Sequence, residues 1–366
     1  MNSNLGNDTM KLFKDAILVQ NVREVVRLVR SGLDVNIEDD NVMSPLMYSA
    51  QVGNKYIVSA LLTLGAQINK RDRNGLTALM YAAKAGNVNT ANSLLENGSD
   101  LNSVDNYQMT ALIYASQFGH ENVVTELIKH GADIQIHGEY GMTALMFALL
   151  HGNTSIVNIL VEAGANLETE DDNRYTTLMY AAISGNRNIV TRLLEREIDI
   201  NYTNISGMTA AMYAASHGQF LILVDLVKKG ADVDIVNIHG QNARMLAQSR
   251  MSEGPTYQNI LTFLEPNNIN EFINNRETLR NMENFDFVRH IRDNNLSSGG
   301  VGPLSNLNSM DDYTVGLIGD MLGVPQYPHS REDGRKKRKP AKKRRSKSNK
   351  RKGKSSKRRS KSNKRK

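Results

Sequence analysis

Residues whose types could do chemistry are few in this chain, and their spacing does not form a catalytic pattern. The sequence contains no cysteine, which excludes disulfides, thiolate zinc sites and cysteine nucleophiles. It contains no P-loop, no H-E-x-x-H, no G-x-S-x-G and no glycine-rich dinucleotide motif after a strand. The histidines lack the paired spacing of zinc ligands; they include His120, His130, His151, His217 and His239. We therefore expect no enzyme activity, no cofactor and no metal site.

Two pairs of neighbouring aspartates are the remaining candidates for acid–base chemistry. They are Asp39-Asp40 and Asp171-Asp172. Both pairs lie between apolar segments, where polar loops connect helices. We interpret them as solvated loop tips rather than as paired catalytic carboxylates.

The densest chemical feature is a run of positive charge at residues 335–366. This run holds 21 Lys or Arg and no acid, whereas residues 1–334 carry a net charge of −14. Because like charges repel and cannot form a core, we expect the run to be disordered. Its predicted nuclear-targeting or phosphate-binding residues are Arg335, Lys336, Lys337, Arg338, Lys339, Lys342, Lys343, Arg344, Arg345, Lys357, Arg358 and Arg359.

The basic run admits more than one interpretation. It resembles basic import signals, which a nuclear import receptor reads, and it also fits phosphate binding on DNA or RNA. It contains no aromatic side chain, so any nucleic-acid binding should be independent of base sequence. A solubilising tail, or a tail that folds back on the acidic body, remains open.

The rest of the chain repeats with a period of 33 residues. The tetrapeptide Thr77-Ala78-Leu79-Met80 recurs in related form at 44, 110, 143, 176, 209 and 242, and glycine recurs at 53, 86, 119, 152, 185 and 218. Ser or Thr before an apolar run is a helix N-cap, and the second glycine column (32, 65, 98, 131, 164 and 230) suits the left-handed residue that ends a helix. Each unit is therefore predicted to be two short helices and an extended loop. Neighbouring units must stack, because one helix pair cannot bury its apolar face alone.

These columns resemble the ankyrin repeat, whose pattern is approximately D-x-x-G-x-T-P-L-H-x-A-A-x-x-G-H-x-x-x-V-x-x-L-L-x-x-G-A-x-x-N. Residues 72–102 follow it nearly throughout, and the resemblance covers about residues 11–266. It implies an all-α solenoid of about eight helix–turn–helix units with extended loop fingers, which begin near 11, 44, 77, 110, 143, 176, 209 and 242. The style of the repeats and the lysine-rich end are similar to those of ankyrin proteins of large DNA viruses that infect protists.

Three departures from the family pattern carry expectations of their own. Met or Ile replaces the family histidine in every front motif, so we expect the hydrogen bonds of that histidine to be absent. Glu197 replaces the helix-ending glycine in the sixth unit, where we expect a strained left-handed residue. The last unit diverges from Arg244 onward, as a capping unit should.

Two ladders of side chains are assigned to packing between the units. One is the Met column of the front motifs, from Met47 to Met245. The other is the aromatic column Tyr48, Tyr81, Tyr114, Phe147, Tyr180 and Tyr213. A Met-lined binding groove and stacking of nucleic-acid bases are the functional alternatives.

The candidate binding surface follows from the family resemblance. Ankyrin arrays bind protein partners through loop tips and the exposed face of the first helices. Large apolar groups at such positions in the middle units are the strongest candidates, because aromatic anchors dominate interface energies. The predicted protein-binding residues are Arg73, Asn74, Lys84, Asn106, Tyr107, Gln117, Phe118, Glu139, Tyr140, Leu150, His151, Asp172 and Ile183.

The expected organisation has five parts. They are an N-terminal extension at 1–10, the solenoid at 11–266, an amphipathic helix at 267–294, a linker at 295–334 and the basic tail at 335–366. Within the linker, residues 311–322 form an apolar island that is either a motif read by a partner or a small docking segment.

We expect a protein-binding adaptor whose tail serves nuclear targeting or nucleic-acid binding. The alternative is a nucleic-acid-associated structural protein in which the tail is primary. The first 30 residues do not form a signal peptide, and no apolar run spans a membrane. The expected compartment is intracellular: the nucleus, the cytoplasm, or the host cell or virion for a viral chain.

Overall fold

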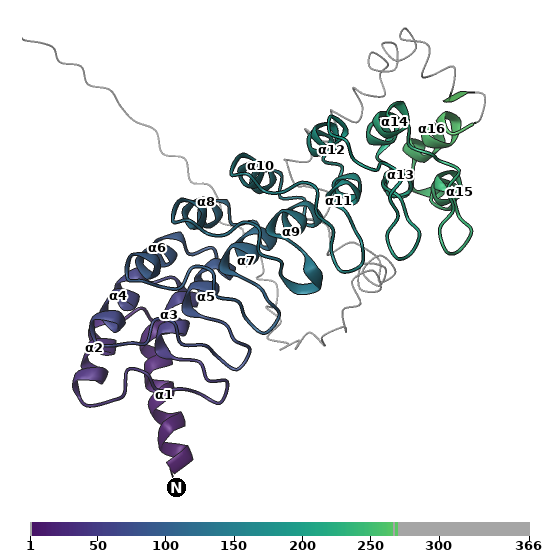
Figure 1. The fold of residues 1–366 in the computed structure, drawn as a ribbon. Helices are drawn as coiled ribbons and strands as arrows, with labels where there is room; N and C mark the ends of the chain where they lie inside the picture. Colours follow the sequence, from purple (N-terminus) through teal and green to yellow (C-terminus); the bar gives the residue numbers. More distant parts are fainter. Residues whose placement is uncertain (1, 266–267, 270–366) are drawn as a thin grey trace, which may run out of the picture. The chain divides into compact units, whose positions relative to one another are not determined.

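The computed structural model describes residues 2–265 and 268–269. This part contains sixteen α-helices and two 3₁₀ turns and no β-strand, only two isolated bridges. The helices form eight consecutive pairs (Figure 1), which are α1 (Asn2–Leu18) and α2 (Val22–Arg30), α3 (Pro45–Val52) and α4 (Lys55–Thr63), α5 (Ala78–Lys84) and α6 (Val88–Glu96), α7 (Ala111–Gln117) and α8 (Glu121–Lys129), α9 (Ala144–Leu150) and α10 (Thr154–Glu162), α11 (Thr177–Ser184) and α12 (Arg187–Leu194), α13 (Ala210–Ser216) and α14 (Phe220–Lys228), and α15 (Ala243–Ser249) and α16 (Pro255–Phe263). The predicted all-α solenoid is confirmed.

The predicted parts differ in how far the structure describes them. Residues 2–10, expected as an extension, belong to α1 together with the start of the first unit. The predicted amphipathic helix at 267–294, apart from residues 268–269, lies outside the described residues. The linker, the 311–322 island and the basic tail lie outside them entirely.

From α3 onward, each first helix begins at the predicted cap. The hydroxyl of Thr110, for example, accepts a hydrogen bond from the backbone N–H of Ile113 at 3.2 Å. In two units the methionine in the place of the family histidine completes the cap, because its thioether sulfur accepts the backbone N–H of the cap residue. Met47 does this for Ser44 and Met80 for Thr77, each at 3.4 Å. These two hydrogen bonds were not predicted from the sequence, which indicated only apolar packing at the methionines.

The helices pack in two rows, with the loops projecting on the side of the first helices (Figure 1). Each first helix contacts the next first helix, as α5 contacts α7, and the second helices contact one another in the same way, as α6 contacts α8, except that α10 and α12 make few contacts. The Met column lies in the core between units and is buried from Met47 to Met212, although Met245 in the last unit is exposed. Packing is thus confirmed as the role of this column.

The aromatic column fastens each loop finger to its own first helix. The phenol of Tyr81 donates a hydrogen bond to Oδ2 of Asp72 at 2.7 Å, while Oδ1 of the same aspartate accepts the backbone N–H groups of Asn74 at 2.9 Å and Leu76 at 2.8 Å. One side chain therefore shapes the finger and anchors it. The same link joins Tyr48 to Asp39, Tyr114 to Asp105 and Tyr180 to Asp171.

Exceptions in the chain show that the two positions depend on each other. In the fifth unit the aromatic residue is Phe147, which has no hydroxyl, and the matching aspartate is replaced by Gly138. In the seventh unit Asn204 replaces the aspartate, and its amide donates to the hydroxyl of Tyr213 at 2.9 Å. The loop changes when the link is lost: a 3₁₀ turn forms at Glu139–Gly141, and the ring of His137 is hydrogen-bonded to the carbonyl of Gly141.

The structure corrects the interpretation of the aspartate pairs. Asp171 is buried and Asp39 is largely covered, because each is the finger-shaping residue of its unit. Asp40 and Asp172 are exposed, as expected of loop tips. Thus one member of each pair is structural, and only the other is solvated.

The strained residues of the fingers were not those expected from the sequence. Glu197 is not among the described residues with positive φ, because α12 ends early at Leu194 and the loop leaves in a different way. Positive φ instead recurs at one finger position with the same 33-residue step, at Val42, Gly75, Gln108, Gly141, Arg174, Gly207 and Gly240.

Two glycines of that finger position offer a matched test. Gly207 and Gly240 have φ of 70° and 71°, but a Cβ at 207 would lie 3.1 Å from the Cα of Asn237 in the next finger, whereas a Cβ at 240 meets nothing within 4 Å. We expect Gly240→Ala to lower the free energy of unfolding by about 1 kcal/mol through backbone strain alone. Gly207→Ala should cost about 1 kcal/mol more through crowding, as measured by denaturant unfolding. Equal losses would show that the fingers do not press on one another.

Replacement by asparagine is expected to have different effects on stability at two of the finger aspartates, Asp39 and Asp171. Burial works against ionised Asp39, but hydrogen bonds from Lys14 and Tyr48 outweigh it and lower the pKa of this carboxyl, whereas burial raises the pKa of Asp171. The ionised form of Asp39 therefore stabilises the fold above the usual aspartate range, and this stabilisation is lost as the pH falls through the lowered pKa. Ionised Asp171 therefore carries a burial penalty at pH values above its raised pKa.

At pH 7 we expect Asp39→Asn to lower the free energy of unfolding by about 1 kcal/mol, since a charge-assisted bond is lost. Asp171→Asn should leave the free energy of unfolding unchanged or raise it, because Asn204 makes the equivalent hydrogen bonds in the next unit. Urea unfolding at pH 7 and pH 3 measures both, and the effect of Asp39→Asn should shrink at the lower pH. A loss at Asp171 as large as that at Asp39 would contradict this account.

Candidate protein-binding surface

An aromatic and cationic cluster lies at the carboxyl ends of two middle first helices. Phe118 caps α7, and its ring stacks on Tyr114 and on His120, with 6.4 Å between centroids in each case. The Nζ of Lys84, at the end of α5, lies 4.6 Å from the centroid of Tyr114 and 5.9 Å from that of Phe118. Phe118 nevertheless stays 51% exposed, so its ring is held in place yet open to a partner.

The backbone fixes this cluster between two units. His120 follows the glycine turn after α7, and its Nε2 is 2.9 Å from the carbonyl of Lys84 in the preceding unit. Burial lowers the pKa of Lys84, while Asp105 and Asp72 act to raise it. Lys84 and Phe118, two of the predicted site residues, are thus brought together. Tyr114 and His120 were not predicted as parts of the cluster, although both lie within four residues of Phe118 in the sequence.

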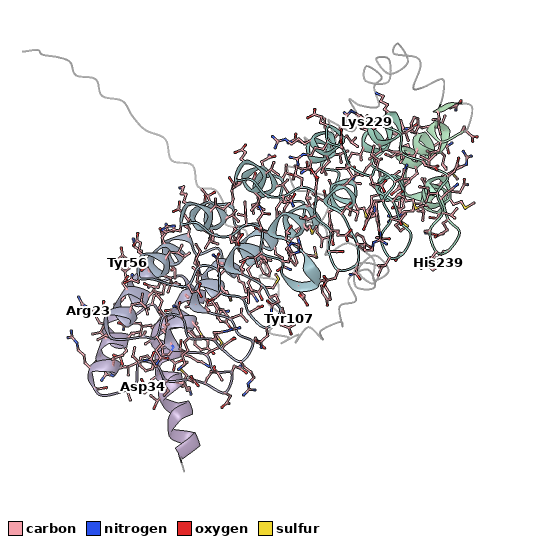
Figure 2. The ribbon with its side chains drawn as sticks, in the orientation of Figure 1. Arg23, Asp34, Tyr56, Tyr107, Lys229 and His239 are labelled. Atoms are coloured by element: carbon pink, nitrogen blue, oxygen red, sulfur yellow. The ribbon has the colours of Figure 1, made fainter. Side chains whose placement is uncertain are left out.

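The predicted tip residues of the second and third fingers are also brought together. The backbone N–H of Asn106 donates to the carbonyl of Asn74 at 3.0 Å, and its side-chain amide donates to the carbonyl of Arg73 at 3.1 Å. All three side chains are exposed, and Tyr107 beside them is 41% exposed. Figure 2 shows Tyr107 on the loop side of the stack, away from Tyr56 on α4.

The fourth and fifth finger tips form a separate group. The carbonyl of Tyr140 accepts the backbone N–H of Asp172 at 2.9 Å, and Tyr140 itself has a φ of 57° in the 3₁₀ turn. Burial raises the pKa of Glu139, against a hydrogen bond from Tyr140. Tyr140 and Glu139 are half-buried, so they offer less surface than the sequence indicated.

The remaining predicted residues on the first helices are less accessible than expected. Leu150 is buried, because every residue of α9 is packed among α7, α10 and α11; its assignment to an exposed surface is wrong. Gln117, His151 and Ile183 are half-buried. Burial also lowers the pKa of His151, whose Nδ1 lies 2.9 Å from the carbonyl of Phe147.

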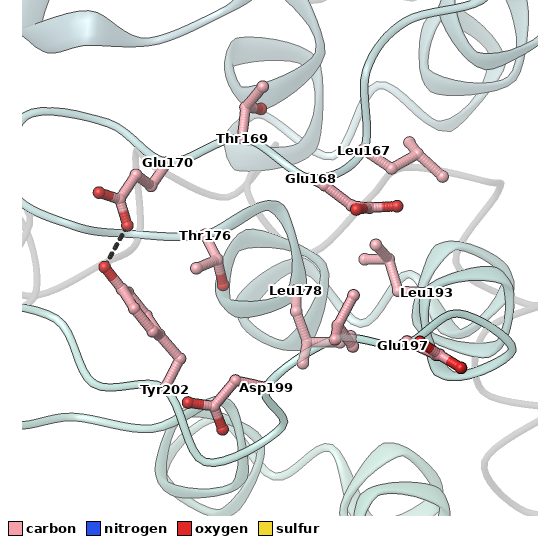
Figure 3. A pocket seen from close by; sticks show the side chains of 11 residues that line it. Leu167, Glu168, Thr169, Glu170, Thr176, Leu178, Leu193, Glu197, Asp199 and Tyr202 are labelled. Carbon is pink, nitrogen blue, oxygen red and sulfur yellow. Dashed lines mark hydrogen bonds between the residues drawn. The ribbon is translucent and has the colours of Figure 1, made fainter.

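A pocket that was not anticipated opens beside the sixth unit (Figure 3), with a volume of about 250 Å³. In earlier units an asparagine bridges two loops, as when Oδ1 of Asn69 accepts the backbone N–H of Asp100 at 2.8 Å. Glu168 stands at this position here and pairs instead with Arg196 at 2.8 Å. With the altered helix end, this leaves an apolar floor and an acidic rim, formed by Leu167, Leu178, Leu193, Glu168, Glu170, Glu197 and Asp199. Glu168 and Glu197 were the sequence signals for it.

The described part of the chain contains neither a candidate metal site nor a candidate membrane span. Within residues 2–265 and 268–269, no three His, Asp or Glu side chains lie close enough together to hold a metal ion. No helix among these residues is long and apolar enough to cross a bilayer.

Comparison with known proteins agrees with this architecture. The family model described as ankyrin repeats (3 copies) matches residues 14–105, 97–171, 135–204 and 163–237, which together make up more than half of the chain. No curated protein matches the sequence. The eight stacked helix pairs and the family match lead to one conclusion: the chain belongs to the ankyrin-repeat family.

Proposed function

We propose that this chain is a non-catalytic adaptor that binds a protein partner through the middle units. Ankyrin repeats are protein-interaction modules in general, and the proposal assigns the contact to the cluster of Lys84, Tyr114, Phe118 and His120 and to the neighbouring tip at Tyr107. The observation that carries it is the exposed ring of Phe118, stacked between two rings of its own unit.

The physical reason is the low entropic cost of a held ring. A side chain that is already fixed in the free protein loses little freedom on binding, so burial of its exposed face contributes more fully to affinity. Aromatic residues set in such positions are frequent hot spots of protein interfaces. The predicted and exposed tip residues beside Tyr107, which are Arg73, Asn74 and Asn106, would form the polar rim of the same contact.

The basic run at 335–366 supports a second role. Twenty-one positive charges attached to an acidic body favour binding to phosphates or to a nuclear import receptor. We propose that the run directs the adaptor to the nucleus or holds it on nucleic acid there. In the alternative role, that of a nucleic-acid-associated structural protein, the run is primary and the repeats tether. A viral origin, which the style of the repeats suggests, would place the chain in the host cell or the virion.

The binding proposal predicts a selective loss. Phe118→Ala should weaken capture of the main partner at least tenfold, because truncation of a hot-spot aromatic side chain costs about 2 kcal/mol or more of binding free energy. Tyr56→Ala removes an aromatic residue that is 66% exposed on α4 and serves as the matched control. Quantitative co-purification with the full chain measures both variants, and circular dichroism checks the helices. If both variants capture the partner equally well, the cluster is not the contact.

The role of the basic run predicts a steep salt dependence. Neutralising about ten phosphates gives a log–log slope near −9, hence roughly a 10⁵-fold loss of affinity between 50 and 200 mM salt. A scrambled run of the same composition should bind DNA equally well. Nuclear import should instead fail when Lys337, Arg338 and Lys339 become Ala, and survive when Lys364, Arg365 and Lys366 do. Fluorescence titration against DNA and imaging of the full chain measure these effects. If the chain neither binds DNA at 50 mM salt nor enters the nucleus, only the role of a solubilising tail is left.

A further inference from the structure

The C-terminal face of the last described unit lies where a ninth unit would stack. The side chains that face a following unit can be identified from the earlier ones. A Cβ at Gly138 would lie 2.9 Å from Cδ1 of Ile113, so the Met-column position of one unit meets the finger of the next. Arg71 likewise reaches forward, donating to the carbonyl of Val104 at 2.7 Å.

In the last unit these two positions are apolar and open. Met245 stands in the Met column and is 53% exposed, although the six preceding members of that column are at most 1% exposed. Val236 stands at the position of Arg71 and is 54% exposed. Both side chains belong to the face toward which no described unit packs.

Other positions of the same face have become polar. Gln241 replaces residues that are apolar in the preceding units, and Arg244 replaces the buried leucine typical of them. Arg244 is tied down by Glu265 at 2.6 Å and by the carbonyl of Leu261 at 3.3 Å. A terminal unit must present a polar outer face to water. The face is therefore polar in part, with one apolar area left around Met245 and Val236.

We propose that residues 269–294 of the same chain cover this apolar area. The segment starts close to the end of α16 at Phe263, since the backbone N–H groups of Asn268 and Ile269 both bond to the carbonyl of Glu265. The sequence that follows carries apolar residues at helical spacing, among them Phe272, Ile273, Met282, Phe285 and Val288. It has the stripe that a docking helix needs.

Connectivity favours this occupant over a separate partner. A segment joined directly to α16 has a high effective concentration at the adjoining face, so even a small apolar contact is populated. An exposed stripe of this kind would otherwise associate with other molecules. Docking on the last unit would bury the stripe and Met245 together.

The absence of cysteine allows a direct test in the full chain. Met245→Cys and Met251→Cys introduce single thiols at sites whose side chains are 53% and 47% exposed among the described residues. If the segment covers position 245, maleimide should label that thiol about tenfold more slowly than the thiol at 251, because labelling then needs local opening. Adding Phe272→Asp and Phe285→Asp should make the two rates equal.

The other outcomes each overturn the proposal. Equal labelling at 245 and 251 in the otherwise unchanged chain shows that nothing covers the face. Slow labelling at 245 that survives the two aspartate substitutions excludes the segment as the cover. If that protection weakens on dilution of the protein, a second copy of the chain is the occupant instead. Circular dichroism confirms that each variant keeps its helices.

Discussion

The shape of five of the described fingers depends on one aspartate or asparagine side chain that bonds in two directions. One oxygen accepts two backbone N–H groups of the loop, and the other group is tied to a tyrosine on the following helix, as at Asp72 and Tyr81. Loops of this length have few internal contacts of their own, so without the link their tips would lack a fixed position. Because the tips carry the candidate contacts, the binding surface depends on a buried interaction that makes no contact with a partner.

The repeat period predicted the helices well because caps and apolar spacing act locally. The hydroxyl of Thr110 caps α7 by accepting the backbone N–H of Ile113, three residues later. Residues of the Met column, such as Met146, are buried where another unit follows. The finger link was missed because its two members are nine residues apart and one is charged. A lone aspartate in a polar loop indicates solvent exposure. Only the structure shows that the tyrosine of the following helix lies within hydrogen-bonding distance of the aspartate.

The errors at the candidate site have a common physical source. A position near the end of a first helix does not by itself specify exposure, which depends on the packing around it. Leu150 and Phe118 lie near the ends of α9 and α7 in adjacent columns of the repeat, and the first is buried whereas the second is 51% exposed. At Glu197 the expected strain was absent: α12 ends at Leu194, one residue earlier than the repeat would place its end, and Glu197 is not among the described residues with positive φ.

Departures from the repeat have local consequences because each unit contacts only its neighbours. The replacement of an asparagine by Glu168 opens a pocket at one junction, and the other loops keep their bridges. The loss of the aspartate at Gly138 reshapes one finger, while the links at Asp105 and Asp171 persist on either side. An array of this kind can therefore change its surface one unit at a time without loss of the fold. For that reason the positions that break the pattern, rather than those that keep it, are where a partner would be recognised.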